Sequence, residues 1–142
     1  MDKRTRAREL AMQALYQLDV QGAAVLELLG RFFAENEEDE SIRKHALEWT
    51  MGTWEHLSRI DELIVGSTIK WQFSRLSPVD KSTLRLAVHQ LLWCPDIPPK
   101  VVINEAIEIA KKYSTDKSPA FVNGVLDAVL RKLKSQSEDQ GR

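Results

Sequence analysis

The chain has 142 residues, of which 43% are hydrophobic and 29% charged, and its formal net charge is −1. This composition is typical of a globular protein and excludes a disordered chain, while no apolar run approaches the about 20 residues that cross a bilayer. The single cysteine, Cys94, allows no intrachain disulfide, which suits the reducing cytoplasm where we expect this protein to act.

Apolar residues recur at steps of three and four in successive segments, which indicates helices, and the strict alternation typical of strands is absent. In the first segment the repeat comprises Ala7, Leu10, Ala11, Ala14, Leu15 and Leu18. The pattern predicts about seven helices, near residues 5–20, 24–35, 40–57, 59–69, 78–93, 99–113 and 118–134. Ser77-Pro78 and Ser118-Pro119 each place a capping hydroxyl before a proline suited to the first helical position.

These helices fit one all-α domain over residues 1–135, built as two packed helical sub-bundles. The stretch from Trp71 to Ser77 is expected to be a break between an N-terminal sub-bundle, about 1–70, and a C-terminal sub-bundle, about 77–135. Residues 136–142 form a tail without apolar anchors. We therefore expect a flexible end that begins to fray after Lys134.

The sequence contains no arrangement of residues typical of an enzyme or a metal site. His45, His56 and His89 do not follow a metal-ligand spacing, and Cys94 has no partner thiol. A glycine-rich phosphate loop and the Gly-x-Ser-x-Gly motif of hydrolases are also missing. We therefore predict no catalytic residue, no metal site and no cofactor.

The strongest functional signal is a cluster of cations at the start of the first predicted helix. It comprises Lys3, Arg4, Arg6 and Arg8, opposed nearby only by Asp2 and Glu9. Cations are unfavourable beside the N-terminal end of a helix dipole, and bound phosphate would remove that cost. The alternative interpretation is a solvated helix end that binds nothing.

A second basic group follows the sixth predicted helix and comprises Lys111, Lys112 and Lys117. The helix dipole alone explains Lys111 and Lys112, because cations are favourable in a last turn. Lys117 and Phe121 instead flank a helix start, and single-stranded RNA is typically held by cations on its backbone and an aromatic ring under a base. Phe121 could equally belong to the core, and the same alternative holds for Tyr16.

A series of sequence blocks is a more specific signal of function than any of these features alone. The blocks comprise Arg6-Ala7-Arg8-Glu9-Leu10-Ala11-Met12-Gln13-Ala14-Leu15-Tyr16, Ser77-Pro78-Val79-Asp80, Leu84-Arg85-Leu86-Ala87-Val88, Ile97-Pro98, Val101-Val102-Ile103-Asn104-Glu105-Ala106 and Phe121-Val122-Asn123-Gly124-Val125-Leu126-Asp127. In this order and spacing they resemble the NusB family of bacterial transcription antitermination factors. The resemblance covers nearly the whole chain and is weakest between residues 20 and 75.

The resemblance implies an all-α fold and a protein that binds without catalysing a reaction. NusB proteins bind the boxA element of ribosomal RNA leader transcripts as a heterodimer with the ribosomal protein NusE. From this likeness we expect an RNA-binding transcription antitermination factor that supports transcription of ribosomal RNA. Its partners would be single-stranded boxA RNA, NusE and the RNA polymerase antitermination complex, with no membrane. The alternative is a helical adaptor protein that binds no RNA.

Carried over to this chain, the family pattern predicts two sets of binding residues. The RNA-binding set comprises Lys3, Arg4, Arg6, Arg8, Gln13, Tyr16, Lys117 and Phe121, and the set facing NusE comprises Asp80, Leu84 and His89. Three features depart from the family pattern, one of which is Pro119-Ala120 in place of more polar residues. His89 stands where a tyrosine is common, and Lys117 stands where many relatives carry an acid.

This assignment requires the first helix and the start of the last helix to be neighbours, with RNA lying across both. The cations of the first helix and the corner at Lys117 and Phe121 would then form one continuous cationic patch. With three to five phosphates neutralised, log K should fall with log salt at a slope of roughly −2 to −4 for single-stranded RNA.

Overall fold

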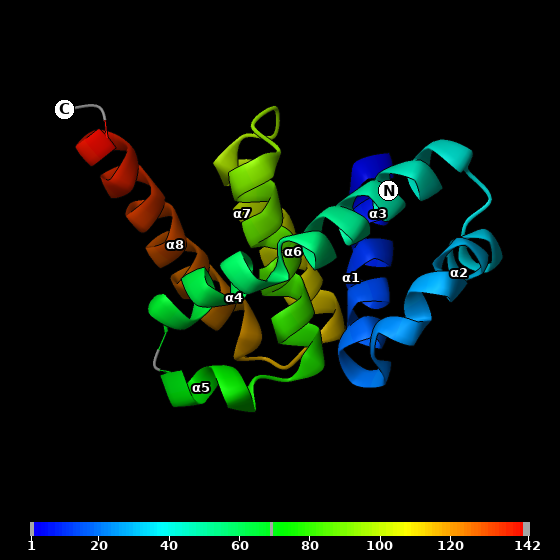
Figure 1. Cartoon of the computed structure of the whole chain (residues 1–142), viewed down its shortest axis with the longest axis horizontal. Helices are drawn as coiled ribbons and strands as arrows, with labels where there is room; N and C mark the ends of the chain where they lie inside the picture. Colours follow the sequence, from blue (N-terminus) through cyan, green and yellow to red (C-terminus); the bar gives the residue numbers. More distant parts are fainter. Residues whose placement is uncertain (1, 69, 141–142) are drawn as a thin grey trace.

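Helices make up the regular structure of residues 2–68 and 70–140, the part of the chain that the computed structural model describes. In chain order the elements are α1 (Lys3–Gln21), η1 (Ala23–Leu28), α2 (Leu29–Asn36), α3 (Glu40–Glu55), α4 (Leu57–Gly66), α5 (Lys70–Arg75), α6 (Pro78–Trp93), α7 (Pro99–Tyr113) and α8 (Ser118–Gln140) (Figure 1). The predicted all-α class is confirmed. Within the same residues, no helix is both long and apolar enough to span a membrane.

The structure corrects the predicted helix boundaries at three places. The second predicted helix is a 3-10 segment followed by the short α2. The stretch expected to be a break contains the helix α5. The last helix continues to Gln140, so the end expected near Lys134 is too early. These differences lie in short or weakly apolar segments, where periodicity is least informative.

Short polar side chains determine where several helices begin. Asp2 caps α1 by accepting hydrogen bonds from two backbone N–H groups of the first turn. Ser77 caps α6 as predicted, accepting from the N–H of Asp80 at 3.1 Å, with Pro78 at the first helical position. Ser118 differs from the prediction. It is the first residue of α8, and its hydroxyl donates to the Asp80 carboxylate at 2.9 Å.

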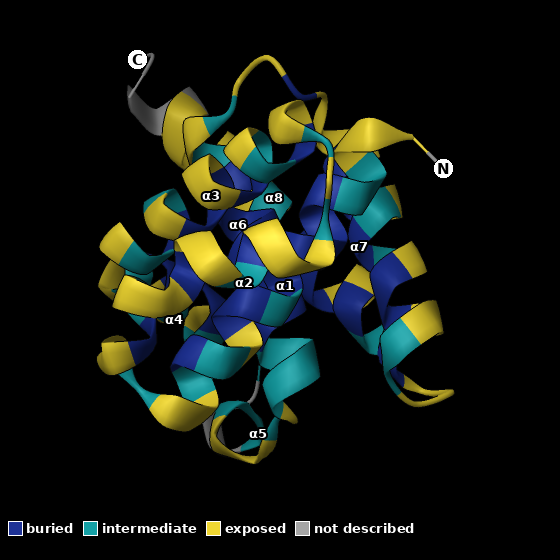
Figure 2. Ribbon diagram, turned by 90° about the vertical axis from the view of Figure 1, so that its right-hand side faces the viewer, coloured by how far each residue is buried: buried dark blue, intermediate teal, exposed yellow. Residues whose placement is uncertain are grey.

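The helices α1 and α6 lie at the centre of the molecule and are buried on nearly every side. α1 packs against α3, α6, η1 and α2, and α6 packs against α1, α7, α3, α4 and α8. Unbroken runs of buried residues, 7–12 in α1 and 82–90 in α6, result from this central position (Figure 2). A surface helix would bury only one stripe. Polar side chains within these two runs are therefore interior residues.

Two interior polar residues of α6 show how the helices are joined. Arg85 donates to both carboxylate oxygens of Asp61 in α4 at 2.8 Å, and to Asp19 in α1 at 3.0 Å. His89 lies so close to Gly52 of α3 that a Cβ at residue 52 would come within 2.5 Å of the imidazole. The glycine therefore permits the close approach of α3 and α6.

Candidate nucleic-acid interface

The cations at the start of α1 are mostly paired with carboxylates. Lys3 contacts Asp39 at 3.0 Å, and Arg6 contacts Glu37 at 3.2 Å and Glu9 at 3.4 Å. The Arg6 guanidinium also donates to the backbone carbonyl of residue 36 at 3.0 Å. Glu9 lies in α1 itself, whereas Glu37 and Asp39 belong to the segment between α2 and α3, which returns to the beginning of α1. Tertiary contacts therefore neutralise part of the basic cluster.

This pairing changes the electrostatic argument for phosphate binding at the helix start. Asp2 already caps α1, and the Ser41 hydroxyl and the Lys3 ammonium hold the pKa of Asp39 well below its usual range. The backbone N–H of Asp39 and the Arg6 guanidinium likewise lower the pKa of Glu37. Because carboxylates supply this compensation, bound phosphate is not needed to stabilise the basic start.

Arg8 is an interior residue, and its burial argues against the predicted contact with RNA. Its residue surface is 3% exposed, and its guanidinium donates to Gln90 in α6 at 3.2 Å and lies 3.5 Å from Glu105 in α7. The same group lies over the Trp49 ring at 5.0 Å. Burial lowers the pKa of Arg8, an effect partly offset by Glu105. Arg8 therefore joins α1 to three neighbouring helices and does not face solvent.

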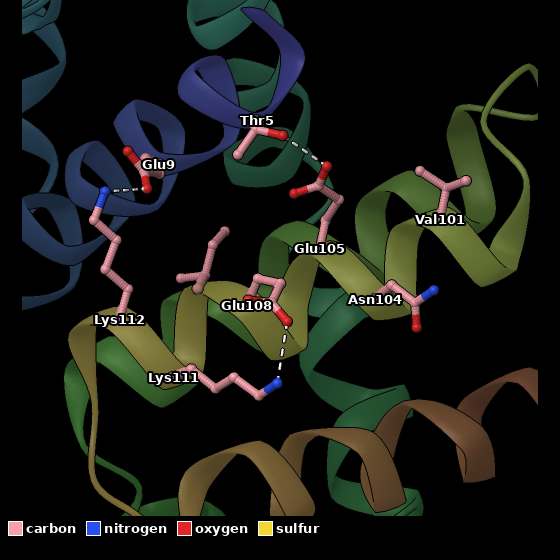
Figure 3. Close-up of a pocket in the computed structure, with 9 residues that line it drawn as sticks. Thr5, Glu9, Val101, Asn104, Glu105, Glu108, Lys111 and Lys112 are labelled. Atoms are coloured by element: carbon pink, nitrogen blue, oxygen red, sulfur yellow. Dashed lines mark hydrogen bonds and ion pairs between the residues drawn. The ribbon is translucent and has the colours of Figure 1, made fainter. Parts of the chain in front are cut away.

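The lysines that end α7 face a groove between α1 and α7, with a volume of about 570 Å³ (Figure 3). Lys112 donates to Glu9 at 2.8 Å, and this bond raises the pKa of Lys112. Lys111 contacts Glu108 at 3.2 Å. Across the groove, the Thr5 hydroxyl donates to Glu105 at 2.7 Å. The groove is thus crossed by paired groups and is not a cationic channel.

Gln13 and Tyr16 line an uncharged hollow on the second half of α1. Its volume is about 400 Å³, and its other lining residues are Met12, Gln17, Gln21, Phe32, Val79 and Tyr113. Tyr16 is 39% exposed, so the alternative that it is a core residue does not hold. Aromatic faces together with side-chain amides can stack on bases and hydrogen-bond to their edges. The hollow therefore suits unstacked bases better than phosphates.

Lys117 and Phe121 lie together where α8 begins. Both line a hollow of about 300 Å³ with Ser77 and Asp80, and Phe121 also lines a neighbouring hollow of about 560 Å³. The ring of Phe121 is half-buried, packed against the core on one side and open to these hollows on others. The ammonium of Lys117 is exposed and makes no ion pair with the described residues. This corner therefore combines an unpaired cation with an accessible ring.

Asp80 fixes the position of this corner. Its carboxylate accepts hydrogen bonds from the Ser114 hydroxyl at 2.7 Å and from the Ser118 hydroxyl at 2.9 Å. The two serines flank the loop between α7 and α8, so Asp80 holds that loop against the start of α6. Since Lys117 ends that loop and Phe121 lies in the first turn of α8, their placement depends on Asp80.

The two basic regions do not form the continuous patch that we expected. α8 packs on α7, α6 and α4, while α1 packs on α3, α6, η1 and α2, so α6 and α7 separate them. The chain enters α1 at one end of the molecule, and the loop that leads into α8 lies at the other (Figure 1). From Arg4 to Tyr16 the helix rises about 18 Å. The uncharged hollow at Tyr16 connects α1 with the Lys117–Phe121 corner, because one of its lining residues is Val79 at the start of α6.

A comparison with protein families identifies the chain. The NusB family model matches residues 5–131, which include most of α1, the central helix α6 and most of α8. The chain belongs to the NusB family. The transcription antitermination protein NusB of Anaeromyxobacter sp. (strain Fw109-5) is 48% identical over 92% of this chain and 92% of its own length. That of Syntrophus aciditrophicus (strain SB) is 41% identical over 99% of this chain and 87% of its own length.

A solved NusB structure has the same fold and contains NusE together with RNA, although that RNA is double-stranded and the RNA that we expected is single-stranded. The complex of the antitermination factors NusB and NusE with double-stranded RNA superposes with a TM-score of 0.83 at 29% identity. The match covers 93% of this chain and 98% of that one. The predicted membership of the NusB family is therefore confirmed in sequence and in fold. NusB is a family of transcription factors rather than of enzymes.

The partner-binding set inferred from the NusB pattern needs correction. Leu84 is fully buried, and His89 is 5% exposed, because α6 is the central helix of the fold. This burial argues against direct contact of either side chain with a partner protein. Asp80 is half-buried and lines the hollow at the Lys117–Phe121 corner, so it is the most accessible of the three.

Several residues of the hollow at Tyr16 could not be found from the sequence. Tyr113, Phe32 and Val79 line the hollow with Gln13 and Tyr16, although they come from α7, α2 and α6. Tyr113 directly follows a pair of lysines at a helix end, which was the one available signal. Phe32 carried none and Val79 only its place in the block Ser77-Pro78-Val79-Asp80, because the packing of α2 and α6 on α1 is what brings them to the site.

Proposed function

We propose that this chain binds boxA RNA of ribosomal RNA leader transcripts together with NusE and so supports ribosomal RNA transcription within the RNA polymerase antitermination complex. The observation that carries the proposal is the unpaired Lys117 beside the accessible ring of Phe121, held in place by Asp80. Family membership and the related complex with NusE and RNA support it. Cytoplasmic action follows from that role.

The RNA path that these contacts favour follows the second half of α1. Bases would stack on Phe121 and enter the uncharged hollow beside Tyr16, while Lys117 would hold a phosphate. Gln13 would hydrogen-bond to a base edge. Lys3 and Arg6 contribute only if their carboxylate partners release them, and Arg4 is the other cation of the predicted set that makes no ion pair with the described residues.

Fewer free cations mean a weaker dependence on salt than the sequence suggested. With Lys117 and Arg4 each neutralising one phosphate, log K should fall with log salt at a slope of about −1 to −2. A half-buried ring and an uncharged hollow accept unstacked bases, which a continuous duplex does not present. Single-stranded RNA is therefore the proposed ligand, although the related complex contains double-stranded RNA.

The test is fluorescence anisotropy with a labelled boxA oligonucleotide, a scrambled oligonucleotide and a boxA duplex, each with and without NusE. We expect tighter binding of single-stranded boxA than of either control, and a further gain when NusE is present. Thermodynamic linkage then requires boxA to raise the affinity of this protein for NusE by the same factor. Equal affinity for boxA and its scrambled form in both conditions would contradict the proposal.

A helical adaptor that binds no RNA is the second candidate, and one observation favours it. Lys3, Arg6 and Arg8 all contact carboxylates, so most of the basic start already has a structural role. The adaptor would bind NusE in the same titration but would show no RNA binding at low salt. The anisotropy experiment therefore separates the two functions.

A further inference from the structure

The hollow at the Lys117–Phe121 corner continues into a second hollow along α8. Phe121 and Gln72 line both, so the two hollows meet at these residues. The second hollow has a volume of about 560 Å³ and lies between α8, α5 and the end of α4, which packs against α8 (Figure 1). Its other lining residues are Gly66, Ser67, Thr68, Ala120, Gly124, Val125, Ala128 and Lys132. We call it the α8 groove, and beyond the ring of Phe121 the RNA path proposed above does not use it.

The floor of the α8 groove contains a glycine that the fold does not require. Gly124 lies in the interior of α8, where glycine is less stable than alanine. Its φ is not positive, and a Cβ built on it would meet no neighbouring atom within 4 Å. Neither a turn nor a neighbouring helix therefore explains this glycine. Ala120 and Ala128, one turn before and one turn after, keep the floor low, so a ligand can approach the backbone of α8 closely.

Cations lie at both ends of this floor. Lys117 precedes it, and Lys132 is the one charged residue among those that line the groove. The Lys132 ammonium donates to the backbone carbonyl of Gly66, which carries no net charge to neutralise it. Arg131 is exposed, makes no ion pair with the described residues, and shares a helix face with Gly124, seven residues earlier. A polyanion laid along α8 would therefore meet cations at both ends of a span of about 22 Å.

A ligand with hydroxyl groups fits the wall of the α8 groove. The Oγ atom of Ser67 is buried and has no hydrogen-bond partner, although buried polar atoms are normally satisfied. The 2′-hydroxyl of RNA both donates and accepts, so it can complete this bond. Among the lining residues that the structure describes, Phe121 is the one aromatic ring on which a base can stack. Contacts further along the groove would therefore be to sugar and phosphate, which position a strand without reading its sequence.

We propose that nucleotides flanking boxA lie in the α8 groove, with their sugars against Gly124 and their phosphates on Arg131 and Lys132. The inference rests on the proposed function, because boxA at Phe121 is what brings the flanking strand to the groove. The single sign of charge and the continuity with the Lys117–Phe121 corner favour RNA over a partner protein at this place. The flanking nucleotides would add affinity whatever their sequence, so the footprint of this chain on the transcript extends beyond boxA.

The experiment compares boxA alone with boxA extended by about four nucleotides at its 5′ end or at its 3′ end, by fluorescence anisotropy on the intact protein without NusE. We expect the extension at one end to raise the affinity roughly tenfold at low salt. It should also steepen the slope of log K against log salt by about 1.4, the value for two added phosphate contacts. If all the oligonucleotides bind with equal affinity, the inference is wrong while the RNA function stands. If none of them binds, even with NusE present, the proposed function itself fails.

A pair of glycine variants tests whether the strand crosses the floor of the groove. Gly124→Leu places a side chain in the groove and should abolish the gain from the extension, while the affinity for boxA alone stays unchanged. Gly30→Leu is the matched control, because Gly30 is also an exposed helical residue with no neighbouring atom within 4 Å of a built Cβ. Thermal unfolding should show both variants folded, since leucine is the better helix former. A full gain with Gly124→Leu would overturn the proposal.

A pair of charge variants tests the phosphate contacts. Arg131→Gln should reduce the salt slope of the extended oligonucleotide by about 0.7 and leave that of boxA alone unchanged. Lys44→Gln is the control, because Lys44 is an exposed cation on α3 that makes no ion pair with the described residues. An unchanged slope with Arg131→Gln would contradict a phosphate at this residue. If Gly124→Leu weakens the binding of NusE and leaves the gain from the extension intact, the groove is a protein-docking site and the proposal is overturned.

Discussion

The start of α1 and the start of α8 both looked cationic in the sequence, but they differ in the fold. At α1, the segment between α2 and α3 supplies Glu37 and Asp39 as partners for Arg6 and Lys3. At α8, Lys117 has no carboxylate partner among the described residues and adjoins the accessible ring of Phe121. Charge density along the chain therefore does not measure the charge that is available to a ligand.

Depth within the fold separates the two regions further. Beneath the start of α1, Arg8 and His89 lie in the interior, where they join α1, α3 and α6. Near the start of α8, Asp80 is only half-buried and organises a surface loop. Substitutions at the first region should therefore change mainly stability, and substitutions at the second should change mainly RNA affinity.

The largest expected effect is the loss of Arg8. Replacing Arg8 by Met removes the partner of Glu105 and Gln90 within the interior, which should lower the free energy of unfolding by about 3–4 kcal/mol. The matched control is Arg4→Met, since Arg4 is exposed and unpaired and should change stability by about 0.5 kcal/mol or less. Urea denaturation measures both. Equal stability of the two variants would show that Arg8 is not a structural residue.

The second effect is a dependence of stability on pH that originates in His89. Burial, together with the nearby His56, lowers its pKa from 6.5 to about 4. Between these values the unfolded chain binds a proton that the folded chain does not, so stability falls as the pH falls from 6.5 to about 4. The full loss is about 3 kcal/mol. Urea denaturation across this range should show a smaller loss for His89→Gln, and identical profiles would exclude His89 as the cause.

The third effect belongs to the start of α8 and concerns RNA. Phe121→Ala should weaken boxA binding by about 1–3 kcal/mol, because a base loses its stacking partner. Phe121→Leu is the control, since it keeps apolar packing against the core but removes the ring. Anisotropy titrations should show weaker binding for both variants. A leucine variant that binds like the wild type would show that packing, rather than stacking, is what residue 121 contributes.

Local signals in the sequence were sufficient for the fold. The helical period and the Ser77-Pro78 start are properties of neighbouring residues, and the structure confirms both. The burial of Arg8 was also visible in principle, because steps of three and four connect it with Ala11 and Leu15 on the apolar face of α1. We gave its charge more weight than its position in that pattern.

The candidate site could not be predicted to the same extent, because its determinants are separated along the chain. Lys3 and Asp39 are far apart in sequence, and nothing local indicates that the acidic run pairs with α1 rather than with solvent. The uncharged hollow at Tyr16 likewise combines residues of α1, α2, α6 and α7. Such combinations follow from packing, which periodicity does not specify.

The smallest expected effect comes from releasing a paired cation at α1. This change is also the most direct test of the difference between the two regions. Glu37→Gln removes the nearer of the two carboxylates that contact Arg6, while its contact with Glu9 at 3.4 Å and the contact of Lys3 with Asp39 remain. If Arg6 then reaches a phosphate, the slope of log K against log salt should steepen by about 0.7, the value for one added contact to single-stranded RNA. Glu35→Gln is the control, because Glu35 pairs with Arg31 on an exposed helix face outside the predicted set. An unchanged slope in both variants would mean that RNA does not reach the start of α1, and that the Lys117–Phe121 corner and the hollow at Tyr16 form the whole interface.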